Sequence, residues 1–312
     1  MIPPFLQLIP EYRQYLWGGQ RLRPGQLTAE AWVVYEQDRV ASGLWAGRTL
    51  AEVSAEFGSD LLGPRALPRT STRFPLLIKL LDCAQWLSLQ VHPNDEQARK
   101  LEGPDQFGKT EAWHILEADP GAKIIAGLKP ATTMDALSQV IRSGTILDLA
   151  QYLPVQSGDT VFMQAGTIHA LGPGLMVYEV QQTSDLTYRV FDWNRPQTGG
   201  RVLHIEKSLA VANPLITSHA LPCPSLLDGS SEQLCQSEYF TLEILNATNS
   251  AIKGDTRGET FHALTITDGA ASLSVGDEVY GLGRYDSVVI PAATGPYRLE
   301  PQGGFRALRS SL

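Results

Sequence analysis

A strand-like pattern occurs twice in this sequence of 312 residues, and the repetition constrains the fold more than any other feature. The first copy is GDTVFMQAGTIH (158–169) and the second is YDSVVIPAATGP (285–296). TEAWHIL (110–116) and GETFHAL (258–264) form a second similar pair. Repetition of a strand-rich unit predicts two related β-barrels or jelly rolls. The first pair matches at Asp159 and Asp286, Thr160 and Ser287, Val161 and Val288, Ala165 and Ala292, and Thr167 and Thr294.

The two copies differ in the residues that could bind a metal ion. His169 in the first copy corresponds to Pro296 in the second, and nothing similar to QVHP (90–93) precedes Glu259. If the copies are related, the first can bind a metal ion and the second cannot. We therefore expect residues 226–312 to form a structural partner of the part that carries the chemistry.

Helical patterns occur mainly in the first half of the chain. Residues 50–62 have apolar side chains at helical spacing and stop at Gly63-Pro64, which predicts one helix. Asn94 can cap a second helix that ends near Gly103, and residues 133–149 predict a third. The remaining chain is rich in short strand patterns with Gly and Pro turns, so a mainly β protein with a few helices in the N-terminal half is expected.

Composition narrows the functional classes. A net charge of -8 argues against a general nucleic-acid binder, which usually carries a basic face. Prolines and charges interrupt the first residues, so no signal peptide is expected, and no run approaches the ~20 apolar residues of a membrane span. Three cysteines without CxxC spacing predict no disulfide framework. A cytoplasmic, reducing location fits best, with neither nucleic acid nor membrane as partner, and no oligomeric state is assigned. A small anionic substrate stays possible, because a few local Arg and Lys can make a basic pocket in an acidic protein.

Four residues are candidate metal ligands: Gln90, His92, Glu111 and His169. Gln90 and His92 alternate on an extended segment, so their side chains leave on the same face. Two neutral imidazoles and a carboxylate suit zinc or another first-row divalent ion, and an amide oxygen can complete the shell. Separations of 19 and 58 residues along the chain match no local ligand motif. Spacing alone therefore leaves open both a metal site and ordinary core histidines.

The other histidines receive a structural interpretation. His114 follows Glu111 by three residues, and in an alternating strand this odd offset places it on the opposite face. His262 occurs in the copy that lacks the candidate site, which favours the same interpretation for His114. His204 and His219 stand alone and are assigned no chemistry.

Several motifs together resemble one family. GDTVFMQAGTIHAL is similar to the second sequence motif of the cupin superfamily, although Gln164 stands where cupins usually have Pro. QVHPND, GKTEAWHIL, AGTIHAL and YRVFDWNR occur in the order found in type I mannose-6-phosphate isomerase (phosphomannose isomerase), and WGG followed by FPLLIKLLD resembles the same family. The likeness covers residues 10–215 and, more weakly, the rest. The chain resembles the short bacterial form, since it has no room for the large helical insertion of longer relatives.

The resemblance implies a fold of two cupin-type jelly-roll β-barrels. The catalytic domain would cover residues 1–225, including N-terminal strands and helices, and a metal-free cupin-like domain would cover residues 226–312. The resemblance also implies site residues by their positions in the motifs. One Zn²⁺ per chain would be bound by Gln90, His92, Glu111 and His169; Arg189 would be catalytic, Lys109 would line the substrate pocket, and Ser88 and Arg195 would contact phosphate together with Lys109.

The implied activity is the interconversion of mannose 6-phosphate and fructose 6-phosphate by a zinc-dependent aldose–ketose isomerase through a cis-enediol. Zinc and the permanent charge of Arg189 would stabilise the enediolate. Glu179 and Lys109 are both candidates for the base, while solvated positions in a strand or turn are the alternative for Glu179 and Asp185. Two other functions stay open: another metal-dependent cupin enzyme, such as an iron dioxygenase, and a non-catalytic sugar-phosphate-binding cupin.

Overall fold

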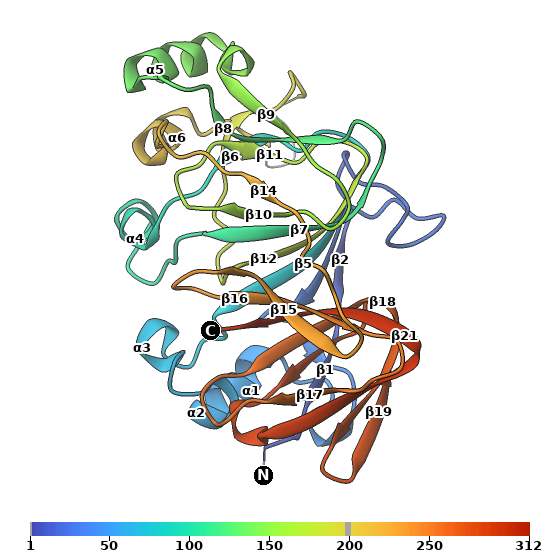
Figure 1. Ribbon diagram of the computed structural model, residues 1–312. Coiled ribbons are helices and arrows are strands. Elements are labelled where there is room, and N and C mark those ends of the chain that lie inside the picture. Colours follow the sequence, from blue (N-terminus) through green and yellow to red (C-terminus); the bar gives the residue numbers. More distant parts are fainter. Residues whose placement is uncertain (1, 197–200) are drawn as a thin grey trace. The chain divides into compact units, whose positions relative to one another are not determined.

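The computed structural model describes residues 2–196 and 201–312. Its chain is mainly β, as expected, and forms two compact units (Figure 1). The site unit contains Arg13–Glu30 and Leu80–Pro222, and the terminal unit contains Met1–Tyr12, Ala31–Lys79 and Cys223–Leu312. The compact units are defined by contacts within the chain. The expected division into a catalytic domain, 1–225, and a metal-free cupin-like domain, 226–312, stays a prediction.

Two sheets form the site unit. The first has the strand order β14-β10-β7-β12-β5 and the second has the order β13-β6-β11-β8-β9. Neighbouring strands in the second sheet are antiparallel. The strands are β5 (Leu76–Cys83, of which Leu80 onward lies in this unit), β6 (Leu89–Val91), β7 (Glu111–Ala118), β8 (Lys123–Leu128), β9 (Ala150–Pro154), β10 (Thr160–Met163), β11 (His169–Ala170), β12 (Leu175–Gln182), β13 (Tyr188–Phe191) and β14 (Ala220–Leu221).

An apolar core lies on one face of each of these two sheets. Trp113 and Ile115 of β7 and Val177 of β12 pack in one cluster with Ile124 of β8, so the cluster joins both sheets. Side chains alternate along a strand, and the intervening residues therefore face the other way. We call the space between the two sheets the interior of the site unit.

The second sheet has another apolar cluster on its outer face. Leu89 and Val91 of β6 and Ile125 of β8 belong to it. The helices α5 (Met134–Ser143) and α6 (Ile205–Val211) cover this face (Figure 1). The position of α6 differs from the expectation that helices would lie in the first half of the chain.

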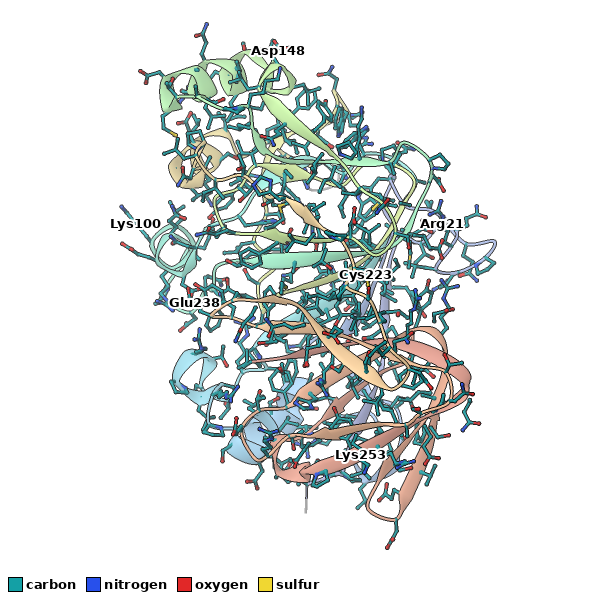
Figure 2. The ribbon with its side chains drawn as sticks, in the orientation of Figure 1. Arg21, Lys100, Asp148, Cys223, Glu238 and Lys253 are labelled. Atoms are coloured by element: carbon teal, nitrogen blue, oxygen red, sulfur yellow. The ribbon has the colours of Figure 1, made fainter. Side chains whose placement is uncertain are left out.

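Helix α4 (Asp95–Glu102) follows the sequence prediction closely. Asn94 caps it through a reciprocal pair of hydrogen bonds: Gln97 N–H donates to Asn94 Oδ1 at 2.9 Å, and Asn94 N–H donates to Gln97 Oε1 at 3.0 Å. The helix ends at Gly103, and Lys100 on its exposed side points away from the molecule (Figure 2). No helix in the described ranges is long and apolar enough to span a bilayer.

The prediction of one helix over residues 50–62 was wrong. The structure has α1 (Leu50–Phe57) and α2 (Ser59–Leu62) separated by Gly58, whose φ of 49° and ψ of -116° end the first helix. Glycine adopts a positive φ without a Cβ penalty, so the chain turns there. In the same way the third expected helix stops early, because Gly144 with φ 74° ends α5 and a 3₁₀ turn, η2 (Ile146–Asp148), follows.

The terminal unit is built on one large sheet with the strand order β15-β16-β21-β18-β20-β1-β4, to which β17 and β19 add as partners of β21 and β18. Its core includes Leu264, Ile266, Val288 and Leu299. The strands are β1 (Leu6–Ile9), β4 (Arg39–Val40), β15 (Ser230–Gln236), β16 (Thr241–Ala247), β17 (Ile252–Asp255), β18 (His262–Val275), β19 (Glu278–Leu282), β20 (Ser287–Ile290) and β21 (Pro296–Ser311). The strands β2 (Glu11–Arg13) and β3 (Glu30–Val34) cross a unit boundary, and α3 (Leu67–Thr70), η1 (Gly43–Trp45) and η3 (Ala292–Thr294) complete the elements.

Strand register refines the sequence repeat. The repeat pairs β10 with β20, and each of these strands pairs antiparallel with a neighbour in its own unit. Met163 of β10 is opposite Glu111, whereas the equivalent Ile290 of β20 is opposite His262. His262, and not Glu259, therefore occupies the position equivalent to Glu111. The sequence alignment of TEAWHIL with GETFHAL is shifted by three residues from this register, which only the hydrogen-bonded ladders reveal.

Candidate active site

Polar residues occupy the interior of the site unit at one end of its apolar core. On β7, Glu111 lies two residues before the core residue Trp113 and so shares its face. On β12, Glu179 and Gln181 continue the inward-facing positions that begin with Val177. All of these residues are buried. The inward-facing positions of these two adjacent strands are thus apolar in the core and polar at this end of the interior.

The second sheet contributes a row of side chains to the same interior. Gln90 lies between Leu89 and Val91, which face the covering helices, so its own side chain faces inward. In the ladders Gln90 is directly opposite His169 of β11 and Arg189 of β13. Directly opposite side chains share a face with Cβ atoms about 5 Å apart. Strand register therefore places Gln90 between His169 and Arg189.

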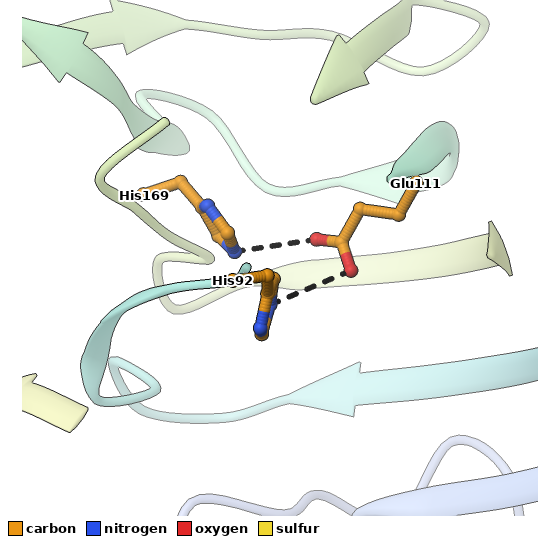
Figure 3. Close-up of side chains that lie close together, drawn as sticks. All are labelled: His92, Glu111 and His169. Atoms are coloured by element: carbon orange, nitrogen blue, oxygen red, sulfur yellow. Dashed lines mark ion pairs between the residues drawn. The ribbon is translucent and has the colours of Figure 1, made fainter. Parts of the chain in front are cut away.

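His92, Glu111 and His169 come together at the centre of this polar end (Figure 3). Both imidazoles point toward the carboxylate: His92 Nε2 lies 3.7 Å from Glu111 Oε2, and His169 Nε2 lies 3.3 Å from Glu111 Oε1. Their ligand atoms all lie within 4.8 Å of one another, and all three side chains are buried. Three of the four candidate ligands thus converge by direct contact, and the fourth, Gln90, adjoins them through the ladder.

The hydrogen bonds of the two histidines fix their tautomers. His92 Nδ1 lies 2.8 Å from the carbonyl oxygen of Leu186, and His169 Nδ1 lies 2.8 Å from that of Thr167. A carbonyl oxygen only accepts, so each Nδ1 carries a proton, and in the neutral ring each Nε2 then presents a lone pair. Both Nε2 atoms are buried without a hydrogen-bond partner. Burial, and then the Lys109 ammonium, lower the pKa of His92 well below its ordinary value, so this ring stays neutral.

These donors fit a divalent metal ion. Two neutral imidazole nitrogens and one carboxylate are a common zinc donor set, and imidazole ligands usually donate their other N–H to a carbonyl, as both do here. Buried acceptors without partners would be costly if nothing bound to them. The three side chains therefore have the chemistry and the preorganisation of a metal site.

Lys109 places a positive charge beside this cluster. Its buried ammonium lies 3.0 Å from Glu111 Oε2 and 3.9 Å from Glu179 Oε1. Burial opposes the ionisation of Glu111, but the Lys109 ammonium beside it holds the pKa of Glu111 well below its ordinary value. Glu111 is thus ionised at neutral pH, as a metal ligand must be.

Trp113 connects the cluster to Glu179 and was not singled out by sequence reasoning. Its indole N–H donates to Glu179 Oε2 at 2.9 Å, and its ring meets His169 edge-on at 5.3 Å between centroids. The spacing of two residues between Glu111 and Trp113 was the available signal, because it places both on one strand face. Glu179 is buried, so the solvated alternative for it was wrong; Asp185 is exposed, as that alternative expected.

Two of the residues expected to bind phosphate flank strands of the second sheet, Ser88 before β6 and Arg195 after β13. Ser88 is buried and immediately precedes β6. Arg195 donates to Asp192 Oδ1 and to Gln85 Oε1, each at 3.2 Å. Arg195 is thus held by the buried carboxylate of Asp192 and the exposed amide of Gln85, and its expected contact with phosphate stays a prediction.

Two histidines outside the cluster have structural roles. His114 Nδ1 lies 2.9 Å from Thr160 Oγ1, and these residues are opposite each other on β7 and β10, so the prediction of a structural His114 is confirmed. His204 was assigned no chemistry, but it ties down Arg189: Arg189 N–H donates to His204 Nδ1 at 3.1 Å, and His204 N–H donates to the Arg189 carbonyl at 2.8 Å. Its separation of 15 residues from Arg189 gave no sequence signal.

Known proteins are similar to this chain in both sequence and fold. The catalytic-domain model of type I phosphomannose isomerase matches residues 5–114. The chain is 35% identical over 303 residues to the mannose-6-phosphate isomerase of Streptococcus mutans, and this alignment covers 93% of this chain and 92% of that protein. It is 33% identical over 305 residues to mannose-6-phosphate isomerase ManA of Bacillus subtilis, with coverages of 93% and 94%.

The chain belongs to the type I mannose-6-phosphate isomerase family. A crystal structure of the mannose 6-phosphate isomerase from Bacillus subtilis superimposes with a TM-score of 0.85 at 30% identity, over 99% of this chain and 100% of that one. Membership of the mannose-6-phosphate isomerase family confirms the resemblance and the fold class expected from the motifs. It makes the chain an isomerase, so the dioxygenase and the non-catalytic binding module lose their support.

Proposed function

We propose that this protein is a zinc-dependent isomerase that interconverts mannose 6-phosphate and fructose 6-phosphate through a cis-enediol. The observation that carries the proposal is the buried group of His92, Glu111 and His169, with Lys109 and Glu179 in contact beside it. Family membership supports the choice of mannose 6-phosphate as substrate, because relatives that match nearly the whole chain are named mannose-6-phosphate isomerase.

One zinc ion per chain would be held by His92, Glu111 and His169, with the amide oxygen of Gln90 completing the donor set. The Nε2 lone pairs fixed by the two carbonyls support this assignment. When bound, the ion would supply Lewis-acid stabilisation of negative charge on substrate oxygens.

The reaction moves one proton between two adjacent carbons. A base removes the proton from C2, the C1–C2 double bond forms, and the electrons of the C1 carbonyl pass to O1, which takes up a proton. The resulting cis-enediol loses the proton on O2, the C2 carbonyl forms, and C1 receives a proton. Glu179 suits the base better than Lys109, because an ammonium paired with Glu111 at 3.0 Å has no lone pair to accept a proton.

Trp113 would hold Glu179 at the reacting carbons, since its N–H fixes one carboxylate oxygen at 2.9 Å. The charges of Lys109 and Arg189 would stabilise the enediolate, and the cross-strand position of Arg189 beside Gln90 supports its placement in the interior. Arg195 and Ser88 would bind the phosphate, Arg195 through charge-assisted hydrogen bonds. A direct contact of Lys109 with phosphate, also expected from the sequence, stays a prediction.

We also propose that the enzyme acts in the cytoplasm. All three cysteines, Cys83, Cys223 and Cys235, are free thiols, which fits a reducing compartment. A small-molecule sugar phosphate needs neither a nucleic-acid face nor a membrane surface.

The test compares chelator-treated and zinc-loaded protein with mannose 6-phosphate while fructose 6-phosphate formation is followed. Turnover should disappear on chelation and return with zinc, and the metal content should be one ion per chain. Folded, zinc-loaded protein without turnover would contradict the substrate assignment. Full turnover after complete metal removal would contradict the zinc assignment alone.

A further inference from the structure

The main chain on both sides of Lys109 is held by side chains from two distant segments. Gly108 N–H donates to Asp95 Oδ1 at 2.7 Å, and Thr110 N–H donates to Gln182 Oε1 at 2.9 Å. Between them Lys109 N–H donates to the Pro93 carbonyl at 2.9 Å. Every N–H of this three-residue segment therefore has an acceptor outside the segment.

Asp95 and Gln182 are also bonded to each other. Gln182 Nε2 donates to Asp95 Oδ1 at 3.0 Å, so one amide group accepts from Thr110 and donates to Asp95 at the same time. Gln182 N–H donates to the Thr110 carbonyl at 3.2 Å, and Gln182 is buried. The Asp95–Gln182 pair thus forms a continuous bridge from the N–H before Lys109 to the N–H after it.

This pair joins the three segments that carry the site. Asp95 follows His92 by three residues, Thr110 immediately precedes Glu111, and Gln182 follows Glu179 by three residues. The packing is close, because a Cβ on Gly108 would lie 2.5 Å from the Asn94 carbonyl carbon. Displacement of one segment would therefore move its neighbours as well.

A lysine side chain has four rotatable bonds, and its ammonium stays near a partner only if its main chain is fixed. Lys109 keeps 3.0 Å to Glu111 and 3.9 Å to Glu179, in a position with almost no exposure to solvent. We propose that the Asp95–Gln182 pair is a positioning element that sets the main chain of residues 108–110 and thereby keeps the Lys109 ammonium between the two carboxylates. The proposal rests on the isomerase function for its kinetic consequence, but the placement of Lys109 can be measured separately.

The kinetic test uses Gln182→Glu, which brings two carboxylates together in place of the amide–carboxylate hydrogen bond. A misplacement of about 1 Å at a catalytic group costs on the order of 100-fold in rate, so kcat should fall about 10- to 100-fold with little change in KM. The conservative variant Asp95→Asn keeps an amide oxygen that can accept from both Gly108 N–H and Gln182 Nε2, and it should keep most of the wild-type kcat. Gln182→Met, which removes both hydrogen bonds without adding charge, replaces Gln182→Glu if that protein does not fold.

Gln97→Ala is the matched control. It removes the hydrogen bond from the Asn94 N–H at the same helix N-terminus and leaves every contact of residues 108–110 in place. It should lower the unfolding temperature while kcat stays at the wild-type value. An equal loss of kcat in Gln97→Ala at matched stability would overturn the proposal, because a general loosening of helix α4 would then explain both variants.

The second readout is the reactivity of Lys109 toward an amine-acylating reagent, measured by peptide mass spectrometry. Lys109 should be protected in the wild type, in Gln97→Ala and in Asp95→Asn, and should become reactive in Gln182→Glu. Protection and kcat that both stay at wild-type values in Gln182→Glu would overturn the positioning role. If the wild type does not turn over mannose 6-phosphate, the proposed function fails, and the acylation pattern alone still decides the positioning role.

Discussion

Replacing Lys109 with methionine tests how the buried charges of the site balance one another. The Lys109 ammonium lies 3.0 Å from Glu111 Oε2, and both side chains are buried. At an effective dielectric constant of about 20 this pair attracts by about 5–6 kcal/mol. Methionine keeps an unbranched chain of similar length but leaves Glu111 charged and uncompensated. Removing one partner of a buried pair costs about 3–5 kcal/mol, and the metal-free variant should lose that much unfolding free energy.

A bound divalent ion should reduce this loss. The ion would compensate the charge of Glu111 in place of Lys109, so zinc-loaded Lys109→Met should be destabilised less than the chelated variant. By thermodynamic linkage, the difference between the two losses equals the gain in zinc-binding free energy caused by the substitution. The variant should therefore bind zinc more tightly than the wild type while losing isomerase activity.

Urea unfolding of chelated and zinc-loaded proteins, together with calorimetric zinc titration, measures both sides of this linkage. Arg142→Met is the control, because the Arg142–Glu206 pair is largely exposed and its loss should cost at most about 1 kcal/mol. A loss below about 1 kcal/mol in chelated Lys109→Met would refute the charge balance described for Glu111. Equal losses with and without zinc would refute the assignment of Glu111 as a zinc ligand.

Three further predictions address single residues. His169→Ala should lose bound zinc and isomerase activity, whereas His114→Ala should keep its zinc; metal analysis and turnover decide, and an active His169→Ala protein would remove the central assignment. Arg195→Ala should raise KM for mannose 6-phosphate about 10- to 100-fold with little change in kcat, since charge-assisted hydrogen bonds contribute about 1.5–3 kcal/mol; an unchanged KM in steady-state kinetics would exclude Arg195 from the phosphate site. In the terminal unit, burial and then the charge of Arg309 lower the pKa of His262 to about 4. In the unfolded chain this histidine has its ordinary pKa of about 6.5 and binds a proton below that pH, whereas the folded protein does not. The free energy of unfolding should therefore fall by about 3 kcal/mol as the pH drops from about 6.5 to 4. His262→Gln should flatten this dependence in urea unfolding between pH 4 and 7, and an unchanged slope would contradict it.

Local patterns were sufficient for much of the fold. Asn94 with Gln97 three residues later predicted a helix start, and the reciprocal capping bonds are present. The odd offset between Glu111 and His114 predicted opposite faces, and His114 bonds to Thr160 outside the group of His92, Glu111 and His169. These features depend on residues within one turn or a few positions of a strand, where backbone geometry alone decides direction. The break at Gly58 was missed because apolar spacing continues across it, and only the backbone dihedral angles show the interruption.

The sequence by itself determined the family, the mainly β class and the residues that could serve as ligands, because motifs and alternation are properties of short segments. Tertiary structure decided which of these residues meet. The bond from Trp113 to Glu179 joins residues 66 positions apart, and the Asp95–Gln182 bond joins residues 87 apart. Such contacts depend on the register between strands and on how loops return to them. Register depends on the hydrophobic patterns of both partner strands and on the turns that join them, so no single segment of the sequence contains it.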